Sequence, residues 1–398
     1  MKHFKSLLLP AMTAAACAVI SSCTQEEIVT SNPGRPIEFH LDVQSRGSDK
    51  TIANLDTIWV YADDGAETVF EATPFIKDQY GNFKSEEKIY WPDGKENINF
   101  TAFWPSPERL NSDPNAADCQ PKHPAYKHVL LDLQPGYCTI KNEMGKNTAH
   151  QFDLITATTT TNRANANNGI SLSFSHAYAQ LEFRAKCDDS AEHTVVVHSM
   201  NISPVNAFSI YSITDKKWQA FKPEGKSDTS YGVYTAPTQV TTITKEVKSL
   251  TSKTGPMFVI PQTLKLAHYG NGNPTSSGGA FIKVFAKVYK DGEQIIPDPN
   301  WTDEEKESRI PKNVSRDDLN SLMNWTECAI LRINISEEET IDLLPGHKYI
   351  FTIDFTNGIG YWAKQDPTNP DMPVLPNPIS MVDVTIADWD SSDYDIMP

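Results

Sequence analysis

The residues best placed for chemistry lie near the amino terminus, where a cysteine ends an apolar stretch. Cys23 directly follows Ile20, Ser21 and Ser22. A basic start, an apolar run and small residues before the end are typical of a secretory signal. Small residues directly before a cysteine are also typical of a bacterial lipobox, in which the signal is removed and the cysteine is acylated. The pattern predicts a lipoprotein signal peptide at 1–22 and a covalent lipid on Cys23.

The predicted lipid would decide where the protein resides. Each methylene of an acyl chain that enters a bilayer contributes about 0.8 kcal/mol, and two or more chains anchor a protein stably. No later stretch of the sequence has the run of roughly 20 apolar residues that a spanning helix needs. We therefore expect the lipid on Cys23 to be the membrane anchor, and we expect no other cofactor.

A polar tether leads from Cys23 to one clean alternating strand at residues 37–43. Its odd positions are apolar and its even positions are polar, so one face is expected to be buried and the other to face water. Arg46 follows in a polar run. This order suggests a lipid-anchored surface protein whose first strand can be cut away. The buried face would consist of Ile37, Phe39, Leu41 and Val43.

Charge and cysteine content argue against several other functions. The chain has 51 Asp and Glu against 35 Lys and Arg, a net charge of −16, which repels nucleic acid, so no nucleic-acid partner is expected. Six widely spaced cysteines without a C-x-x-C pair argue against a metal site. Cys119 and Cys138 could form a loop disulfide, although buried free thiols fit as well. We assign no catalytic residue, because no Gly-x-Ser-x-Gly, phosphate loop or dinucleotide fingerprint occurs.

Short runs with period two dominate the rest of the chain and predict an all-β protein of the sandwich type. The length exceeds what one core usually holds, which indicates two domains. A polar stretch at 158–169 sets the expected boundary, with an amino-terminal sandwich at 47–165 and a carboxy-terminal sandwich at 166–398. Short helices are predicted at the capping box 302–305 and at 315–324.

Several segments resemble the fimbrillin family of Bacteroidales, the subunits of type V pili. Each segment is a loose match alone, but the set occurs in the family's order after a lipobox. The segments in the first half are residues 37–39, 45–47, 89–92 and 99–105. Those in the second half are residues 172–183, 258–262, 344–352 and 384–389.

The resemblance implies a fold of two tandem transthyretin-like β-sandwiches, here with short helical insertions. It also implies that an arginine-specific protease cuts between Arg46 and Gly47, which frees the strand within residues 23–46. A strand from the next subunit would then fill the vacated slot, and in this chain the donor would be the tail 381–398. The donor side chains would be Val382, Val384 and Ile386.

The implied partners are other pilus subunits, an arginine-specific protease and the outer membrane, with surface exposure before maturation and a pilus after it. Burying four apolar side chains of the replaced strand would contribute on the order of 6–12 kcal/mol before entropy. One alternative is that 37–43 is an ordinary first strand. Another is a monomeric surface lipoprotein that binds glycans or host ligands. Its candidate aromatic residues are Trp301, Trp325 and Trp362.

Overall fold

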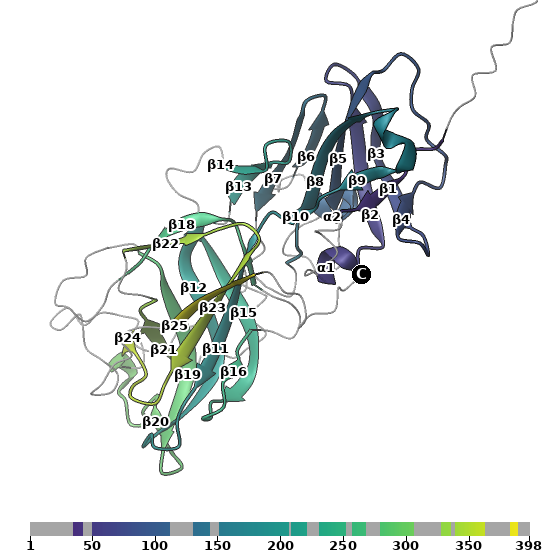
Figure 1. Ribbon diagram of the computed structural model, residues 1–398. Coiled ribbons are helices and arrows are strands. Elements are labelled where there is room, and N and C mark those ends of the chain that lie inside the picture. The colour runs from purple at the N-terminus through teal and green to yellow at the C-terminus, as the bar shows by residue number, and fades with distance from the viewer. Residues whose placement is uncertain are drawn as a thin grey trace, which may run out of the picture.

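Strands make up nearly all of the regular structure in the computed structural model of the chain, which confirms the all-β prediction. The elements form two lobes joined by a small sheet (Figure 1). The structure describes residues 35–42, 50–111, 130–143, 151–206, 208–220, 231–251, 257–267, 279–305, 328–335, 339–362 and 383–388.

The first lobe is a curled sheet with the strand order β10-β8-β5-β2-β3-β4-β1-β9 among the described residues. β9 and β10 follow one another closely in the sequence but lie at opposite ends of this order, so the sheet curves round on itself. Short helices α1 (Lys50–Ala53), α2 (Pro107–Leu110) and η3 (Asn165–Asn168) lie in its connections. The strands are β1 (Phe39–Leu41), β2 (Thr57–Asp63), β3 (Thr68–Lys77), β4 (Asn82–Lys84), β5 (Asn97–Trp104), β8 (Ile155–Asn162), β9 (Ile170–Leu172) and β10 (Ser175–His176).

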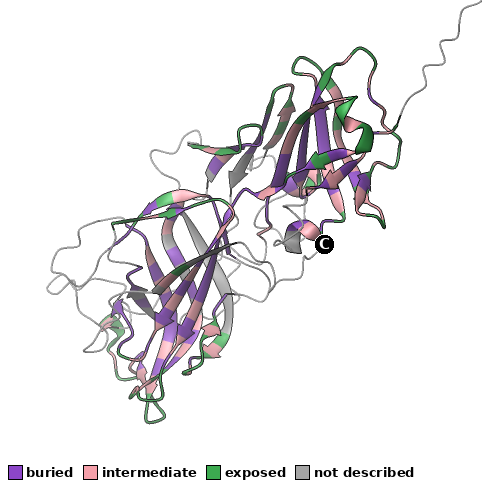
Figure 2. Cartoon of the chain, viewed as in Figure 1, coloured by how far each residue is buried: buried purple, intermediate pink, exposed green. Residues whose placement is uncertain are grey.

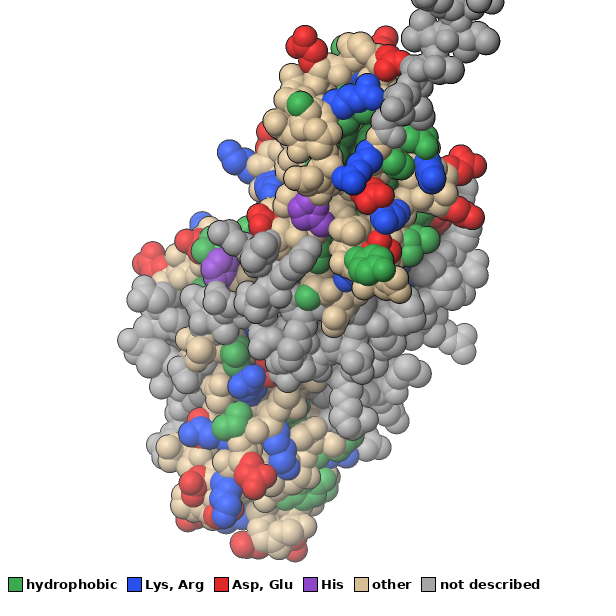
Figure 3. Space-filling view, turned by 45° about the vertical axis from the view of Figure 1, so that its right-hand side comes forward, with side chains coloured by type: hydrophobic (Ala, Val, Ile, Leu, Met, Phe, Trp, Pro, Cys, Tyr) green, Lys and Arg blue, Asp and Glu red, His purple; other side chains and the backbone are tan. Residues whose placement is uncertain are grey.

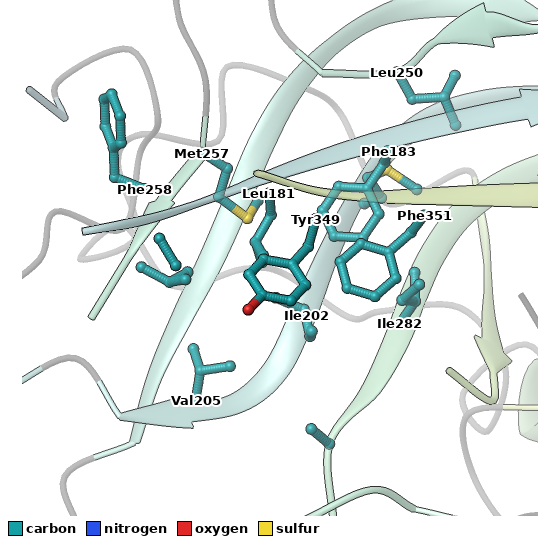
Figure 4. Packing of buried hydrophobic residues seen from close by; sticks show 14 of the residues in the cluster. Leu181, Phe183, Ile202, Val205, Leu250, Met257, Phe258, Ile282, Tyr349 and Phe351 are labelled. Atoms are coloured by element: carbon teal, nitrogen blue, oxygen red, sulfur yellow. The ribbon is translucent and has the colours of Figure 1, made fainter. Parts of the chain in front are cut away.

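The second lobe contains two larger sheets whose inner faces share a core. One has the order β16-β11-β23-β25, and β17 also pairs with β11. The strands of this sheet are β11 (Ala179–Lys186), β16 (Lys248–Ser249), β17 (Met257–Val259), β23 (His347–Asp354) and β25 (Asp383–Asp388). Figure 4 shows Phe183, Tyr349 and Phe351 of this sheet beside Ile202 and Ile282, which belong to the other sheet.

The other large sheet of the second lobe has the order β15-β12-β19-β21-β24, with β20 paired to β19, and a two-stranded sheet of β18 and β22 accompanies it. The bounds are β12 (Thr194–Asn206), β15 (Tyr231–Thr242), β18 (Gln262–Lys265), β19 (Phe281–Lys290), β20 (Glu293–Ile296), β21 (Ala329–Ile333), β22 (Thr340–Leu343) and β24 (Tyr361–Trp362). Buried residues follow the inner faces of both lobes, and exposed residues gather at strand ends and turns (Figure 2).

A smaller sheet with the order β14-β13-β7-β6 joins the two lobes. Its strands come from both halves of the chain: β6 (Leu130–Gln134) and β7 (Tyr137–Glu143), then β13 (Phe208–Ser212) and β14 (Lys217–Ala220). Trp218 of β14 donates a hydrogen bond from Nε1 to the carbonyl of Ala177, at 2.6 Å, where the chain passes between the lobes. Its ring also packs on Tyr178 and Tyr211, so the connection between the lobes is covered by aromatic side chains.

These pairings cross the expected domain boundary between residues 165 and 166. β9 lies beyond that boundary but belongs to the first sheet, and β13 lies beyond it but pairs with β7. The division into 47–165 and 166–398 stays a prediction. The capping box at 302–305 is present: the backbone N–H of Glu305 donates to Thr302 Oγ1, and that of Thr302 donates to Glu305 Oε2. The second predicted helix, 315–324, lies outside the described residues.

Candidate functional site

β1, the first strand of the described chain, is inserted between two other strands. It runs antiparallel to β4, with Phe39 opposite Phe83. On its other side it runs parallel to β9, with Phe39 opposite Ile170 and Leu41 opposite Leu172. Both of its edges are therefore occupied, and within the described residues β9 has β1 as its partner in the sheet order.

Backbone hydrogen bonds continue this pairing beyond the ends of the strand. The N–H of Ile37 donates to the carbonyl of Ile89 at 2.7 Å, and the N–H of Asp42 donates to the carbonyl of Leu172 at 2.9 Å. The N–H of Ile170 donates to the carbonyl of Glu38 at 2.8 Å. The inserted segment thus extends over residues 37–42, close to the range that the alternation predicts.

The inward face of this segment is apolar and almost fully buried. Ile37 is 5%, Phe39 0% and Leu41 4% exposed. The Phe39 ring meets Phe75 of β3 edge-on at 4.9 Å between centroids and meets Phe100 of β5 at 5.3 Å. Phe39 therefore occupies an aromatic site in the core of the first lobe, which we call the first core. Val43 lies outside the described residues.

The outward face of the segment is polar and carries exposed charges. Lys84 lies 3.6 Å from Glu38 and 3.0 Å from Asp78. The hydrogen bond to Asp78 and the charge of Glu38 raise the pKa of Lys84. The N–H of Asn82 and the ammonium of Lys84 lower the pKa of Asp78. These groups tie β1 to β4 only at the surface, where ion pairs contribute little.

A polar hollow of about 380 Å³ lies beside this surface. Arg35 lines it and donates a hydrogen bond to the carbonyl of Asn167 at 2.7 Å. Glu38 and Lys84 line it as well. On the described part of the face in Figure 3, acidic and basic side chains are interspersed, and they form no basic stripe there.

The chain after β1 is anchored again before it enters the second strand. Ile52 of α1 and Leu55 are 4% and 2% exposed and belong to the same core as Phe39. Lys77 donates a hydrogen bond to the carbonyl of Ala53 at 2.7 Å. The described chain is thus fixed on both sides of the interval that contains Arg46 and Gly47, although those two residues lie outside the described ranges.

β25, which contains two of the three predicted donor positions, Val384 and Ile386, lies at the end of a sheet in the second lobe. It runs antiparallel to β23, with Val384 opposite Phe351 and Ile386 opposite Tyr349. Val384 is half-buried and packs against the second core. In the strand order of the described residues, β23 is its one neighbour. Val382 and the side chain of Ile386 lie outside what the structure describes.

The sheet on which β25 lies contains a buried ion pair that the sequence did not predict. Lys348 of β23 lies 2.7 Å from Glu182 of β11, and both side chains are more than nine-tenths buried. Arg184 donates a second hydrogen bond to Glu182 at 2.6 Å. Burial raises the pKa of Glu182, but the hydrogen bonds from Arg184 and Lys348 outweigh it, and the net pKa lies below its usual value.

Three other residues that the sequence draws attention to have ordinary surroundings. His176 is buried and hydrogen-bonded through Nδ1 to Asp153. Trp301 is partly buried and packs against the second core. Cys138 is a buried free thiol. Cys23, Cys119, Trp325 and the side chain of Trp362 lie outside what the structure describes.

The described residues hold neither of two features that would suggest another kind of site. They contain no group of three or more His, Cys, Asp or Glu side chains placed to hold a metal ion. Within the same ranges, no helix is both long and apolar enough to cross a bilayer.

The sequence also did not predict that β9 is a partner of β1. Ile170 and Leu172 alternate in phase with Phe39 and Leu41, but they lie more than a hundred positions away.

The protein is an all-β chain of two lobes, and its first described strand is inserted between two other strands. The sequence profile of the fimbrillin-like family matches residues 45–389. The chain belongs to this family, whose members have fimbrial structural or adhesion roles at the cell surface and assemble with other pilus subunits. The family is not an enzymatic one.

The chain also has some similarity to solved structures. A fimbrial protein from Bacteroides vulgatus is 14% identical with a TM-score of 0.49, and the match covers 89% of this chain and 100% of that one. The fimbrial anchor protein Mfa2 from Porphyromonas gingivalis is 11% identical with a TM-score of 0.32, and the match covers 89% of this chain and 98% of that one. No curated protein sequence matches the chain.

Proposed function

We propose that this chain is a fimbrial subunit that is exported as a lipoprotein, is cut after Arg46 and then exchanges its first strand for one from a neighbouring subunit. The observation that carries the proposal is the position of β1 between β4 and β9, with three apolar side chains in the core. No described strand lies between residues 42 and 50, so a cut there leaves every described strand whole. The chain after the cut stays anchored in the core through Ile52 and Leu55.

The energetics of the inserted strand favour exchange over simple loss. Burial of Ile37, Phe39 and Leu41 contributes on the order of 5–9 kcal/mol before entropy. Without β1, the edges of β4 and β9 would expose unpaired backbone groups beside an apolar groove. A strand from another molecule would pair with these backbone groups and fill the apolar groove, which is strand addition. Because groove and donor are different surfaces, the contact is head-to-tail and extends into a fibre.

The two ends of the chain would supply the lipid anchor and the donor strand. At the amino terminus, Cys23 would carry the lipid that holds the precursor in the outer membrane until the cut releases it. Arg35 is a poorer cleavage site than Arg46, because Pro36 follows it and its guanidinium is hydrogen-bonded. At the carboxyl terminus, the tail 381–398 would leave β23 to act as donor. β25 has one described neighbour to break from, whereas β1 has two.

The amino-terminal sequence of the subunit in surface fibres tests the proposal. Fibres sheared from cells that make this chain are expected to yield a subunit that begins at Gly47. A subunit that still begins at Cys23 with its lipid would overturn strand exchange at this end.

Arg46→Ala and Arg35→Ala form the matched pair for the same experiment. Arg46→Ala should leave the chain cell-bound and absent from fibres, because no cut separates β1 from the lobe. Arg35→Ala should behave like the unchanged chain. Palmitate labelling of whole cells, with Cys23→Ala as control, checks the lipid independently.

A further inference from the structure

The geometry points to a specific partner for the slot of β1, and this inference rests on the proposed function. We propose that the slot takes a strand whose central inward-facing side chain is aromatic and that this strand comes from a different subunit. The strand 381–389 of a second copy of this chain would fill the slot poorly.

The site of Phe39 is shaped by other aromatic rings. Phe75 and Phe100 meet the ring edge-on at 4.9 and 5.3 Å, with interplanar angles of 80° and 75°. Phe70 lies 6.1 and 6.2 Å from those same two rings, and Trp91 lies 6.0 Å from Phe100. Edge-to-face contacts of this kind favour an aromatic occupant beyond the area that it buries. An occupant of smaller volume leaves a cavity, since close-packed cores relax only in part.

The segment 381–389 of the tail offers no aromatic residue in phase with its valines. By the alternation of the sequence, Val382, Val384 and Ile386 share one face of a strand, and Asp388 continues the same phase. With Val384 in the centre, a valine meets the Phe39 site whichever way the strand runs. A shift of two positions brings Val382 or Ile386 to that site, and one of these shifts also places Asp388 in the groove. Trp389 has the opposite phase and would point outward.

The tail fits its own sheet much better than it fits this slot. In the second lobe, Val384 lies opposite Phe351, whose ring stacks on Phe183 at 5.4 Å. There the aromatic residues belong to the sheet and the tail supplies the smaller side chain. In the slot of β1 the arrangement is reversed, because the strand itself must supply the ring. The two sites therefore select strands of different composition.

Competition between peptides tests this specificity on the whole chain. The protein is cut with an arginine-specific protease in the presence of peptides, and native mass spectrometry records which peptide the cut chain binds. A peptide of residues 37–43 should bind. The same peptide with Phe39→Val should bind at least about tenfold more weakly, because the cavity cost exceeds the roughly 1.4 kcal/mol that corresponds to a factor of ten. His40→Val, on the outward face, is the matched control and should bind like the unchanged peptide.

The tail peptide 381–389 extends the test to the donor. It should bind about as weakly as the Phe39→Val peptide. Val384→Phe should raise its binding about tenfold, whereas Thr385→Phe, on the opposite face, should not. Because only the peptides change, folding of the protein is not at risk.

The outcomes separate this inference from the proposed function. If the 37–43 peptide never replaces β1 after the cut, strand exchange itself fails. If that peptide binds but the Phe39→Val or tail peptide binds equally well, strand exchange stands and the aromatic requirement is wrong.

Discussion

The first and last strands of the described chain carry the same alternating pattern, yet they are held in different ways. β1 has a neighbour on each edge, and its three inward side chains are at most 5% exposed. β25 has β23 as its neighbour in the described sheet, and Val384 is only half-buried. The first strand is part of a core, whereas the last strand covers the margin of one.

For the strand exchange that we propose, this difference indicates which end of the molecule would need a covalent cut first. To leave, β1 must break two ladders and open the aromatic site of Phe39. As long as residues 42 and 50 are joined through the chain, the strand also remains next to its slot. β25 must break one ladder, and within the described residues it lies at the end of the sheet order. In the proposed exchange, a cut is therefore expected to be needed at the amino terminus and not at the carboxyl terminus.

Removal of the central ring of β1 should have the largest effect on stability. Phe39→Ala leaves a cavity between Phe75 and Phe100 and should lower the free energy of unfolding of the first lobe by about 3–5 kcal/mol. Denaturant unfolding followed by tryptophan fluorescence measures the change. His40→Ala, on the outward face, should cost less than about 1 kcal/mol. A small loss for Phe39→Ala would mean that β1 is not part of the core.

The buried ion pair between β11 and β23 should give the next largest effect. Lys348→Met leaves Glu182 with Arg184 alone and should destabilise the second lobe by about 3 kcal/mol, the low end for a broken buried pair. Because the pKa of Glu182 is lowered on folding, its contribution is present above its ordinary pKa and is lost as the pH falls through the folded value.

The measurement for this pair is unfolding at neutral and acidic pH. The difference between Lys348→Met and the unchanged chain should shrink at acidic pH. The exposed pair of Lys186 and Asp354, 2.9 Å apart, supplies the control, and Lys186→Met should be nearly neutral. A pH-independent loss in Lys348→Met would attribute its effect to packing alone.

Truncation of the last strand should cost less than truncation of the first. Val384→Ala removes a half-buried side chain and should lower the stability of the second lobe by about 1 kcal/mol. Thr385→Ala, exposed on the other face, should change it by less than about 0.5 kcal/mol. The comparison fails if Val384→Ala costs as much as Phe39→Ala in the same denaturant.

The surface contacts of β1 should have the smallest effect. Lys84→Met removes the exposed bridge to Glu38 and Asp78 and should slightly lower the melting temperature at pH 7 and low salt. The pKa of Asp78 is lowered on folding, so its contribution is lost as the pH falls through the folded value. The raised pKa of Lys84 gives a contribution that is complete below its ordinary pKa and is lost as the pH rises through the folded value. Melting curves at pH 3 and pH 7, with and without salt, check that the effect disappears in acid and in salt.

Strands with strong alternation could be predicted from the sequence, and strands without it could not. β2, β5 and β11 lie where period-two patterns predict them. β3, by contrast, could not be predicted from the sequence. Pro74 interrupts it and most of its residues are exposed or half-buried, so its sequence lacks the apolar rhythm of a strand with one buried face. It becomes a strand because β2 pairs along its length.

Some features of the candidate site could likewise be predicted from the sequence, and others could not. The sequence predicts that Ile37, Phe39 and Leu41 share a buried face, and the structure bears this out. It did not predict that β9 runs parallel to β1, since it placed residues 170–174 in the other domain. Nor did it predict the buried pair of Glu182 and Lys348, because the two residues become neighbours only through the pairing of β11 with β23.

The sequence by itself determined which residues of each strand face inward, because that choice depends on a period of two along a few neighbouring positions. It also placed Cys23, the first strand and Arg46 in that order. The tertiary structure decided which strands flank β1, which rings surround Phe39 and which edge β25 occupies. These features depend on contacts between residues far apart in the chain, and no local pattern encodes them.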